Sequence, residues 1–266
     1  MHLIDTHAHL DAEEFDGDRD GVLARARESG VDGMICPAIS FGSSLSALAL
    51  SETHGEEEPK AVYAAVGIQP NYCAEAASHH WEAIRAFVLH EGVVAVGETG
   101  LDRHWDFTPM EVQRDYFDRH LQLAREHDLP VVIHCREAEA DVLAMLREAV
   151  ARGPLAGVMH AFSGDRSFAE ACLELGLYVS FAGSVTYTNK KFRPLRDAAA
   201  VVPDDRVLLE TDAPYLTPQP LRGRRKRNEP AHLVHTAQCL AALRGQGVEE
   251  LAAQTTANAR RLFRLP

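Results

Sequence analysis

Residues 4–10 read Ile-Asp-Thr-His-Ala-His-Leu, a short apolar run that ends in two histidines separated by one residue. In a β-strand successive side chains point to opposite faces, so residues two apart point the same way. His7 and His9 could therefore bind one metal ion from the end of the first strand. By themselves they are equally compatible with two solvated loop histidines, so their meaning depends on the rest of the chain.

Short β-branched runs recur along the chain and alternate with longer stretches of helical periodicity. The expected strands span residues 2–6, 33–37, 62–67, 93–97, 130–134, 157–160, 177–181 and 206–210. Helical stretches between them include residues 17–29, 79–90, 110–127, 138–150 and 189–200, and helices at 229–243 and 248–262 close the chain. Strands that alternate with helices predict a parallel sheet. We expect an α/β fold, a TIM (β/α)8 barrel with an extra C-terminal helix, formed by residues 1–266 as a single domain.

Composition and charge exclude several other classes of protein. The net charge is −12, and an acidic surface disfavours broad electrostatic binding to duplex nucleic acid, although a locally basic mouth stays compatible with it. No apolar stretch approaches the ~20 residues of a membrane helix, so no membrane partner is expected. The start of the chain lacks the features of a signal peptide. The five cysteines show no CxxC spacing, which favours a reducing, cytoplasmic location.

Residues of metal-ligand type fall near the ends of five of the expected strands: His7, His9, Glu98, His134, His160 and Asp212. In a TIM barrel the active site lies at the C-terminal ends of the strands, so these side chains should meet there. Four histidines and two carboxylates are too many for one tetrahedral zinc ion. They fit two divalent ions, which can hold a hydroxide between them and stabilise both oxygens of a displacement.

The two carboxylates have different expected roles at such a site. Glu98 comes from the fourth strand, between the two histidine groups, and is the predicted bridge between the ions. Asp212 is predicted to be a metal ligand and the acceptor of the attacking water's proton. Glu210 points to the same side as Asp212 but lies deeper. It could orient a histidine ligand by a hydrogen bond, or it could be a structural buried carboxylate.

Other histidines and one cysteine have plainer interpretations. Cys135 lies between His134 and Arg136, but strand alternation turns it away from the face that His134 uses. A buried structural thiol is therefore favoured over a nucleophile. Solvated surface positions are expected for His54, His79, His80, His90, His120 and His127.

Six ordered segments carry a family resemblance that runs over almost the whole chain. They are IDTHAHLD (4–11), VGETGLD (96–102), LPVVIHCRE (129–137), HAFSG (160–164), ETDAPYLTP (210–218) and KRNEP (226–230). The set resembles the TatD family of metal-dependent hydrolases, which belongs with the amidohydrolase-like barrels. The resemblance implies the same six metal ligands, Mg²⁺ or Mn²⁺ as cofactor, and deoxyribonuclease activity, often 3′ to 5′ on single strands. Zn²⁺ is the alternative metal that histidine ligands leave open.

The chain departs from the family pattern at three places. Gln69 replaces the histidine of a GIHP segment, and its neutral amide can still bond a phosphate or sugar. After GLD the chain reads Arg103-His104-Trp105 where an aromatic pair is usual, and the segment RGRRKRNEP is two residues longer than its usual form. These changes leave the predicted metal centre intact and bear on the identity of the substrate.

Phosphate contacts of a DNA substrate are predicted at Arg136, Gln69, Arg225 and Arg227, the last two within the basic run 222–227. A solvated loop is the equal alternative for that run. Four aromatic side chains could stack bases or, equally, pack the rim: Trp105, Phe107, Tyr187 and Tyr215.

Two other functions remain compatible with the sequence. A metal-dependent hydrolase of this fold can act on a small amide, lactone or ester, or on an aminoacyl ester of tRNA. A metal-buffering or scaffold protein would keep the ligands without turnover, and the complete ligand set disfavours it. The sequence does not indicate an oligomeric state, and a monomer is compatible with it.

Overall fold

The strands of the protein are apolar over most of their length and almost wholly buried, as expected of a parallel sheet covered on both faces. The computed structural model describes residues 1–54, 61–225 and 227–266. The strands are β1 (Leu3–Asp5), β2 (Val31–Pro37), β3 (Val62–Val66), β4 (Val93–Asp102), β5 (Val131–Arg136), β6 (Gly157–Met159), β7 (Tyr178–Phe181) and β8 (Val207–Leu209). All neighbours pair in parallel in the order β1 to β8.

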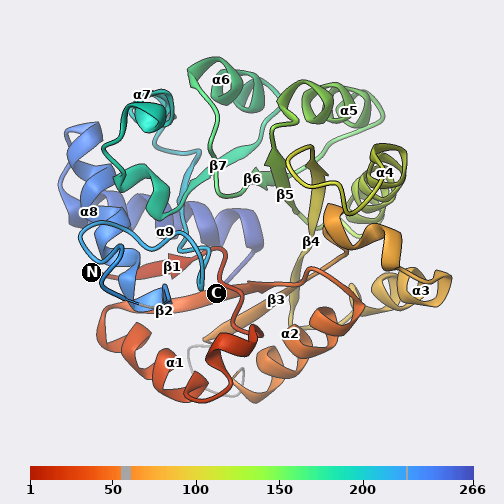
Figure 1. Cartoon of the computed structure of the whole chain (residues 1–266), viewed down its shortest axis with the longest axis horizontal. Helices are drawn as coiled ribbons and strands as arrows, with labels where there is room; N and C mark the ends of the chain where they lie inside the picture. Colours follow the sequence, from red (N-terminus) through yellow and green to blue (C-terminus); the bar gives the residue numbers. More distant parts are fainter. Residues whose placement is uncertain (55–60, 226) are drawn as a thin grey trace.

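The first and last strands meet, which makes the sheet a nearly closed barrel (Figure 1). The backbone N–H of Thr6 donates to the carbonyl of Leu209, and Ala8 forms an isolated parallel bridge with Ala213. The expected TIM barrel is therefore confirmed.

Helices surround the barrel and cover its outer face (Figure 1). They are α1 (Arg19–Glu28), α2 (Phe41–Thr53), α3 (Ser78–Phe87), α4 (Met110–Glu126), α5 (Glu139–Ala151), α6 (Arg166–Glu174), α7 (Arg193–Ala199), α8 (Leu233–Arg244) and α9 (Val248–Phe263). Short 3₁₀ turns are η1 (Glu13–Phe15), η2 (Pro70–Glu75), η3 (Gly183–Thr186), η4 (Lys190–Phe192) and η5 (Pro230–His232). None of the helices in the described parts of the chain has the length and apolar character needed to cross a bilayer.

Three expectations about the elements need correction. Helices α2 and α6 were not expected, although each has an N-cap side chain that marks its start: Ser40 accepts from the N–H of Ser43, and Asp165 from that of Phe168. The helix expected at 189–200 is a 3₁₀ turn, η4, followed by α7. Strands β4 and β5 run past their expected ends, so Glu98 and His134 lie within strands and not at their last residues.

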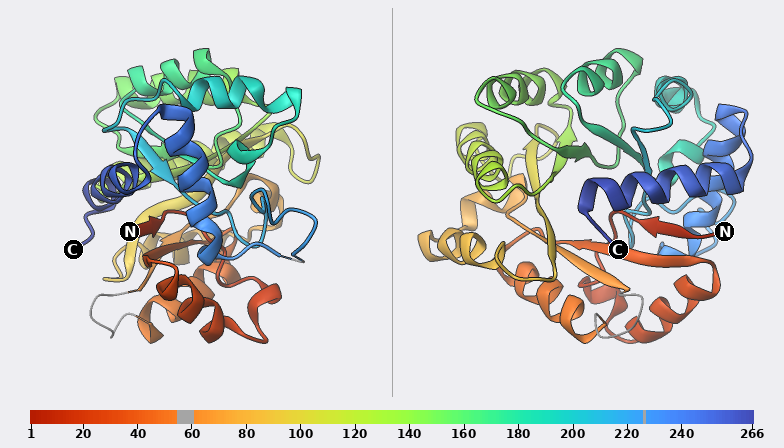
Figure 2. Two further views of the ribbon diagram at one scale, coloured as in Figure 1. Left: turned by 90° about the vertical axis from the view of Figure 1, so that its left-hand side faces the viewer. Right: turned by 180° about the vertical axis from the view of Figure 1, so that it is seen from behind.

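Side chains of the last helix, α9, pack into the barrel interior at the N-terminal ends of the strands. The inward side chains of the strands, among them Ile35 and Val132, pack with Leu262 and Phe263 of α9. Figure 2 shows α9 lying across the barrel on the side away from the viewer of Figure 1. The side-chain amide of Asn258 in α9 donates to the carbonyl of Val207 at the start of β8. The N-terminal end of the barrel is thereby covered, and the C-terminal end faces the viewer in Figure 1.

Replacing Phe263 by alanine is expected to lower the free energy of unfolding by roughly 3–5 kcal/mol, because the ring is buried and its removal leaves a cavity under the barrel. Urea denaturation measures this change. Arg260→Ala on the exposed side of the same helix is the control and should stay within about 0.5 kcal/mol of the parent. Equal losses in the two variants would show that α9 does not support the barrel interior.

Candidate metal centre

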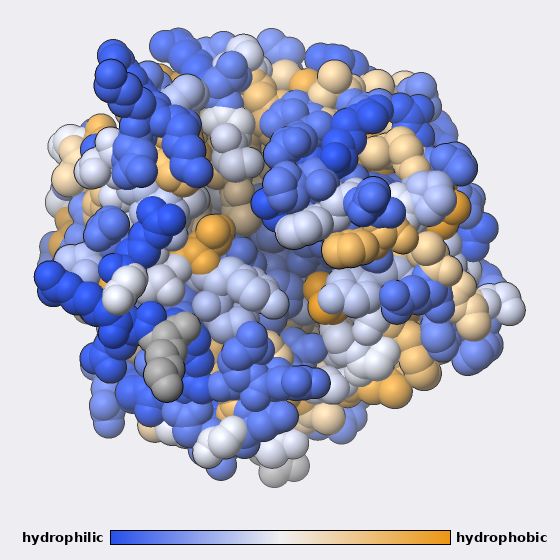
Figure 3. Space-filling view, viewed as in Figure 1, coloured by the Kyte–Doolittle hydropathy of each residue, from blue (hydrophilic) through white to orange (hydrophobic). Residues whose placement is uncertain are grey.

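The C-terminal face of the barrel is hollowed near its centre (Figure 3). Beneath this face, buried or nearly buried side chains from five strands or their exits come together: His7, His9, Glu98, His134, His160 and Asp212. The structure thus brings together all six residues that the sequence predicted as one cluster.

Glu98 lies between two pairs of histidines, and each of its carboxylate oxygens faces one pair. Oε2 is 3.4 Å from Nε2 of His7 and 3.8 Å from Nε2 of His9. Oε1 is 2.9 Å from Nδ1 of His134 and 3.2 Å from Nε2 of His160. This is the arrangement that a carboxylate needs in order to bridge two cations.

Glycines in β4 determine where Glu98 lies. Gly97 has a φ of +146°, and a Cβ there would lie 2.7 Å from the carbonyl oxygen of Val132 in β5. Gly100 has a φ of +140°, and its Cβ would lie 2.0 Å from the carbonyl oxygen of His134. Only glycine permits this backbone and this approach of the two strands. The register of β4 and β5 shifts between Val96 and Thr99, which is where Glu98 turns into the cluster.

Asp212 completes the half of the cluster formed by His7 and His9. Its Oδ1 is 3.5 Å from Nε2 of His9 and 3.7 Å from Nε2 of His7. Asp212 has a φ of 54°, a left-handed conformation in which aspartate and asparagine are enriched. Its N–H donates to the carbonyl of His7, which ties the exit of β8 to that of β1.

Hydrogen bonds orient the histidine rings toward the centre of the cluster. Nδ1 of His9 lies 3.2 Å from the carbonyl oxygen of Pro37, which leaves Nε2 facing inward. Nε2 of His134 lies 3.0 Å from Oδ2 of Asp102, which leaves Nδ1 facing Glu98. Such partners on the far nitrogen are typical of metal-binding histidines. Asp102 was not singled out in the sequence, although it ends the segment VGETGLD.

Glu210 lies beneath the cluster, where one sequence interpretation placed it. Its Oε1 accepts from the N–H of Ala161 and is 3.6 Å from Nδ1 of His160. The rings of His7 and His160 stack with centroids 3.9 Å apart, and ligand atoms of both lie within 4.8 Å of a Glu210 oxygen. The carboxylate therefore lies beside the outer nitrogen of His160, and the ring of His7 stacks on that of His160.

The spacing of the ring nitrogens fits bound cations. Nε2 of His7 and Nε2 of His9 are 3.2 Å apart, and Nε2 of His160 and Nδ1 of His134 are 3.4 Å apart. Two nitrogens that each lie about 2.1 Å from one ion would be separated by about this much. Among the described residues, His7, His9 and Glu98 form one group whose ligand atoms lie close enough together to hold an ion. Glu98, His134 and His160 form a second such group.

The charges of the cluster agree with this interpretation. Burial raises the pKa of Glu98, but the charges and hydrogen bonds of the surrounding histidines outweigh it and hold the pKa well below its usual value. Burial opposes ionisation of Asp212 too, and its hydrogen bond with His9 lowers the pKa in spite of it. For His9, burial lowers the pKa, but Asp212 and Glu98 raise it to about 9. Two ionised carboxylates thus attract positive charge into a buried space.

Two further polar residues that sequence reasoning missed brace the loop that carries Asp212. Buried Asp5 accepts hydrogen bonds from the N–H and the hydroxyl of Thr211. The side-chain amide of buried Asn228 donates to the carbonyls of Thr211 and Tyr215. Asp5 and Asn228 lie inside the quoted segments IDTHAHLD and KRNEP, so the motifs contained the signal.

The four predicted substrate contacts lie in different surroundings. Gln69 is nearly buried, and its side-chain oxygen caps η2 by accepting from the N–H of Asn71. Arg136 is exposed, two residues after His134, and Arg225 is exposed in the loop that crosses the same face. Arg227 forms an ion pair with Asp18 at 2.6 Å and is held against α1. Their roles toward a substrate stay predictions.

The structure corrects the expected position of His120 and shows how far Cys135 is buried. His120 was expected on the surface, but it is fully buried. Its ring bonds the carbonyl of Tyr116 and the N–H of Ile68, because the backbone around Ile68 needs a partner inside the protein. Cys135 is half-buried and not fully buried, and burial raises the pKa of its thiol to about 12. The thiolate is therefore scarce at neutral pH, which agrees with the structural interpretation.

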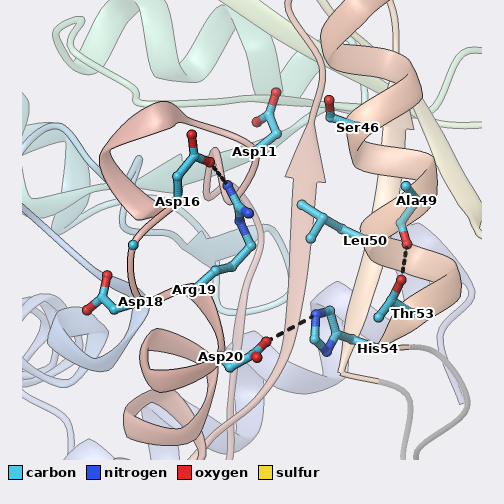
Figure 4. Close-up of a pocket in the computed structure, with 11 residues that line it drawn as sticks. Asp11, Asp16, Asp18, Arg19, Asp20, Ser46, Ala49, Leu50, Thr53 and His54 are labelled. Atoms are coloured by element: carbon cyan, nitrogen blue, oxygen red, sulfur yellow. Dashed lines mark hydrogen bonds and ion pairs between the residues drawn. The ribbon is translucent and has the colours of Figure 1, made fainter.

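A second hollow lies outside the barrel between α1 and α2 (Figure 4). Its lining is strongly acidic, with Asp11, Asp16, Asp18 and Asp20 among its residues. Arg19 pairs with Asp16 at 2.6 Å within it. The excess of carboxylates would repel a phosphate backbone, so this hollow does not favour a nucleic acid.

Comparison with known proteins agrees with the geometry. Residues 4–264 match the family model for TatD related DNase. The chain is 39% identical over 263 residues to the metal-dependent hydrolase YabD of Bacillus subtilis, with 99% of each chain covered. It is 38% identical to the 3′-5′ ssDNA/RNA exonuclease TatD of Erwinia tasmaniensis, over 99% of this chain and 100% of that protein.

A solved structure supports the same assignment. The crystal structure of YJJV, a TatD homologue from Escherichia coli K12, superposes with a TM-score of 0.89 at 32% identity and covers 99% of this chain and 98% of that one. The resemblance seen in the six sequence segments is confirmed. The chain belongs to the TatD related DNase family and is a metal-dependent hydrolase.

Proposed function

We propose that the protein is a deoxyribonuclease that removes nucleotides from the 3′ ends of single-stranded DNA with the help of two divalent ions, Mg²⁺ or Mn²⁺. The placement of Glu98, with one carboxylate oxygen toward each histidine pair, is the observation that carries the proposal. The relative from Erwinia tasmaniensis, named as a 3′-5′ exonuclease of single-stranded DNA and RNA, supports the choice of substrate.

His7, His9 and Asp212 would hold one ion, His134 and His160 the other, and Glu98 both. When bound, the ions would supply Lewis-acid stabilisation of the charge that builds on the phosphoryl oxygens. Oxygen and imidazole ligands around both positions suit Mn²⁺, and the carboxylates suit Mg²⁺. Glu210 and Asp102 would keep the histidine rings in the orientation that binding requires.

Asp212 is the proposed proton acceptor for the attacking water. Its side chain is 13% exposed and opens toward the hollow, whereas that of Glu98 is 4% exposed. A general base must reach both the water and an exit for the proton, so the more accessible carboxylate is the better candidate. Its lowered pKa keeps it ionised and ready to accept at neutral pH.

The basic loop after β8 is proposed to contact the phosphate backbone. Arg224 and Arg225 are exposed there, and within the described part of the chain neither forms an ion pair. They line a groove beside α1 in which Arg25 and Arg227 are already neutralised by Glu229 and Asp18. Arg224 and Arg225 are therefore the cations of the groove that remain available to a phosphate, beside the carboxylates of Glu14 and Glu28. Arg136, and the amide of Gln69, would contact phosphate or sugar nearer the metal centre.

Glu98→Gln should reduce the bound divalent metal from about two ions per chain to one or none, because a neutral amide cannot serve as an anionic bridge. Elemental analysis after dialysis against metal-containing buffer measures the content. Glu111→Gln makes the same exchange of carboxylate for amide at an exposed position on α4. It is the matched control and should keep the parent's metal content. Two retained ions in Glu98→Gln would contradict the bridging role.

Asp212→Asn should lower kcat for single-stranded DNA by roughly 10²–10⁴, the range associated with loss of a general base. The asparagine tolerates the left-handed backbone, so the thermal melt should stay near that of the parent. Activity near the parent's level would move the base role to another carboxylate, with Glu210 the first to test.

Neutralising Arg224 and Arg225 together should weaken DNA binding regardless of sequence and flatten its salt dependence. Each lost phosphate contact reduces the slope of log K against log salt by about 0.7 for single strands. Fluorescence anisotropy at several salt concentrations measures the slope. Arg260→Ala/Arg261→Ala removes the same charge from α9 at the opposite end of the barrel and should leave the slope unchanged. An unchanged slope in the loop variant would identify the run as solvated loop.

A further inference from the structure

Two large aromatic side chains lie exposed on the loop that follows β4. Trp105 is 45% exposed and Phe107 is 62% exposed. Their rings stack on each other with centroids 5.4 Å apart and an interplanar angle of 11°. Together we call Trp105 and Phe107 the aromatic platform. Large apolar rings are costly to leave in water, so a rigid exposed pair indicates a ligand.

The loop that carries the aromatic platform is firmly held. The side chain of Gln113, which is buried in α4, accepts from the N–H of Asp102 and donates to the carbonyls of Asp102 and Thr108. The hydroxyl of Thr108 accepts from the N–H of Ala74 in η2. Both ends of the loop are therefore fixed, and the rings are presented in a defined position without an ordering cost on binding.

The aromatic platform is joined to the metal centre by one carboxylate. Oδ1 of Asp102 accepts from the N–H of Trp105 at 3.1 Å, and Oδ2 lies 3.0 Å from Nε2 of His134. Arg136, two residues after His134 on β5, places its guanidinium 5.6 Å from the centre of the Trp105 ring. The rings, an exposed cation and the histidine side of the metal centre are thus neighbours.

We infer that the aromatic platform is a nucleobase-binding subsite, which stacks an unpaired base of the DNA strand beside the bond to be cleaved, while Arg136 contacts the adjoining phosphate. This inference rests on the proposed nuclease function and adds the means of selecting single strands. Aromatic rings with a neighbouring cation match the alternation of base and phosphate in a strand.

Stacking explains why such a subsite would prefer single strands. In a duplex each base is covered on both faces by its neighbours, so it cannot lie flat on a protein ring without first being unstacked. A frayed 3′ end or a single strand offers an open face at little cost. The platform therefore discriminates by the availability of the base face and is tolerant of sequence.

Binding can be measured with the metal-loaded protein and a short phosphorothioate-linked oligonucleotide that resists cleavage. The chain has two tryptophans, so Trp81→Phe leaves Trp105 as the only one. In that background the single strand should quench the Trp105 fluorescence, and a blunt duplex of the same sequence should not. Equal quenching by both, or none by the single strand, would overturn the inference.

Affinity is compared between variants that keep apolar bulk and variants that keep the rings. Trp105→Leu/Phe107→Leu should weaken single-strand binding by about 10- to 100-fold in an anisotropy titration, the range for loss of base stacking. Trp105→Phe/Phe107→Tyr keeps both rings and should stay within a few-fold of the parent. Leu89→Ala, an exposed apolar side chain after α3, is the control and should have no effect. Equal losses in the leucine and aromatic variants would overturn the inference.

Turnover with a missing base separates stacking from a general effect on the active site. The parent should cleave a strand that lacks the base next to the scissile bond about 10- to 100-fold less efficiently than the intact strand. The leucine variant should cleave the intact strand as slowly as the parent cleaves the abasic one, and should cleave the abasic strand at the parent's rate. A parent indifferent to the base would contradict the inference.

The two proposals fail in different ways. If the parent cleaves no DNA with any divalent ion, the nuclease proposal falls, and the quenching and anisotropy measurements still decide whether the platform binds bases. If the parent cleaves DNA and the leucine variant matches it on every substrate, the platform inference falls alone.

Discussion

The contacts of the Glu98 carboxylate are the constraint on which the functional end of the protein depends. One oxygen faces His7 and His9, and the other faces His134 and His160. This position exists only because β4 approaches β5 closely at two glycines that no other residue could replace. The close packing of β4 against β5 and the position of Glu98 are therefore both set by the segment 96–102.

Buried polar residues around the cluster hold its side chains in fixed positions. Asp102 holds a ring nitrogen of His134, Glu210 lies beneath His160, and Asn228 closes the loop around Asp212. Each of these groups is buried, so its hydrogen bonds are strong and its loss would leave a neighbour unsatisfied. Preorganisation of this kind lets the site keep its shape while charge builds up during the reaction.

The two ends of the barrel have opposite tasks. At one end α9 seals the interior with Leu262 and Phe263, which supplies stability without chemistry. At the other end the strands or their exits carry the charged and polar side chains of the cluster, beneath a face that is hollowed near its centre. Because the net charge of the chain is −12, local cations at this end are what could attract a phosphate backbone. Arg136, Arg224 and Arg225 are exposed, whereas the acidic hollow lies between α1 and α2.

The sequence by itself determined the barrel and which six side chains meet at its rim, because strand periodicity is local and parallel strands bring their C-terminal ends together. It missed α2 and α6, whose caps are short signals, and it ended β4 before Glu98 because glycine normally weakens a strand. Only the tertiary structure placed His120 in the core and paired Arg227 with Asp18. It alone joined Asp102 to both His134 and Trp105. The contacts of Asp102 with His134 and of Arg227 with Asp18 link residues far apart in the chain, and no local pattern records them.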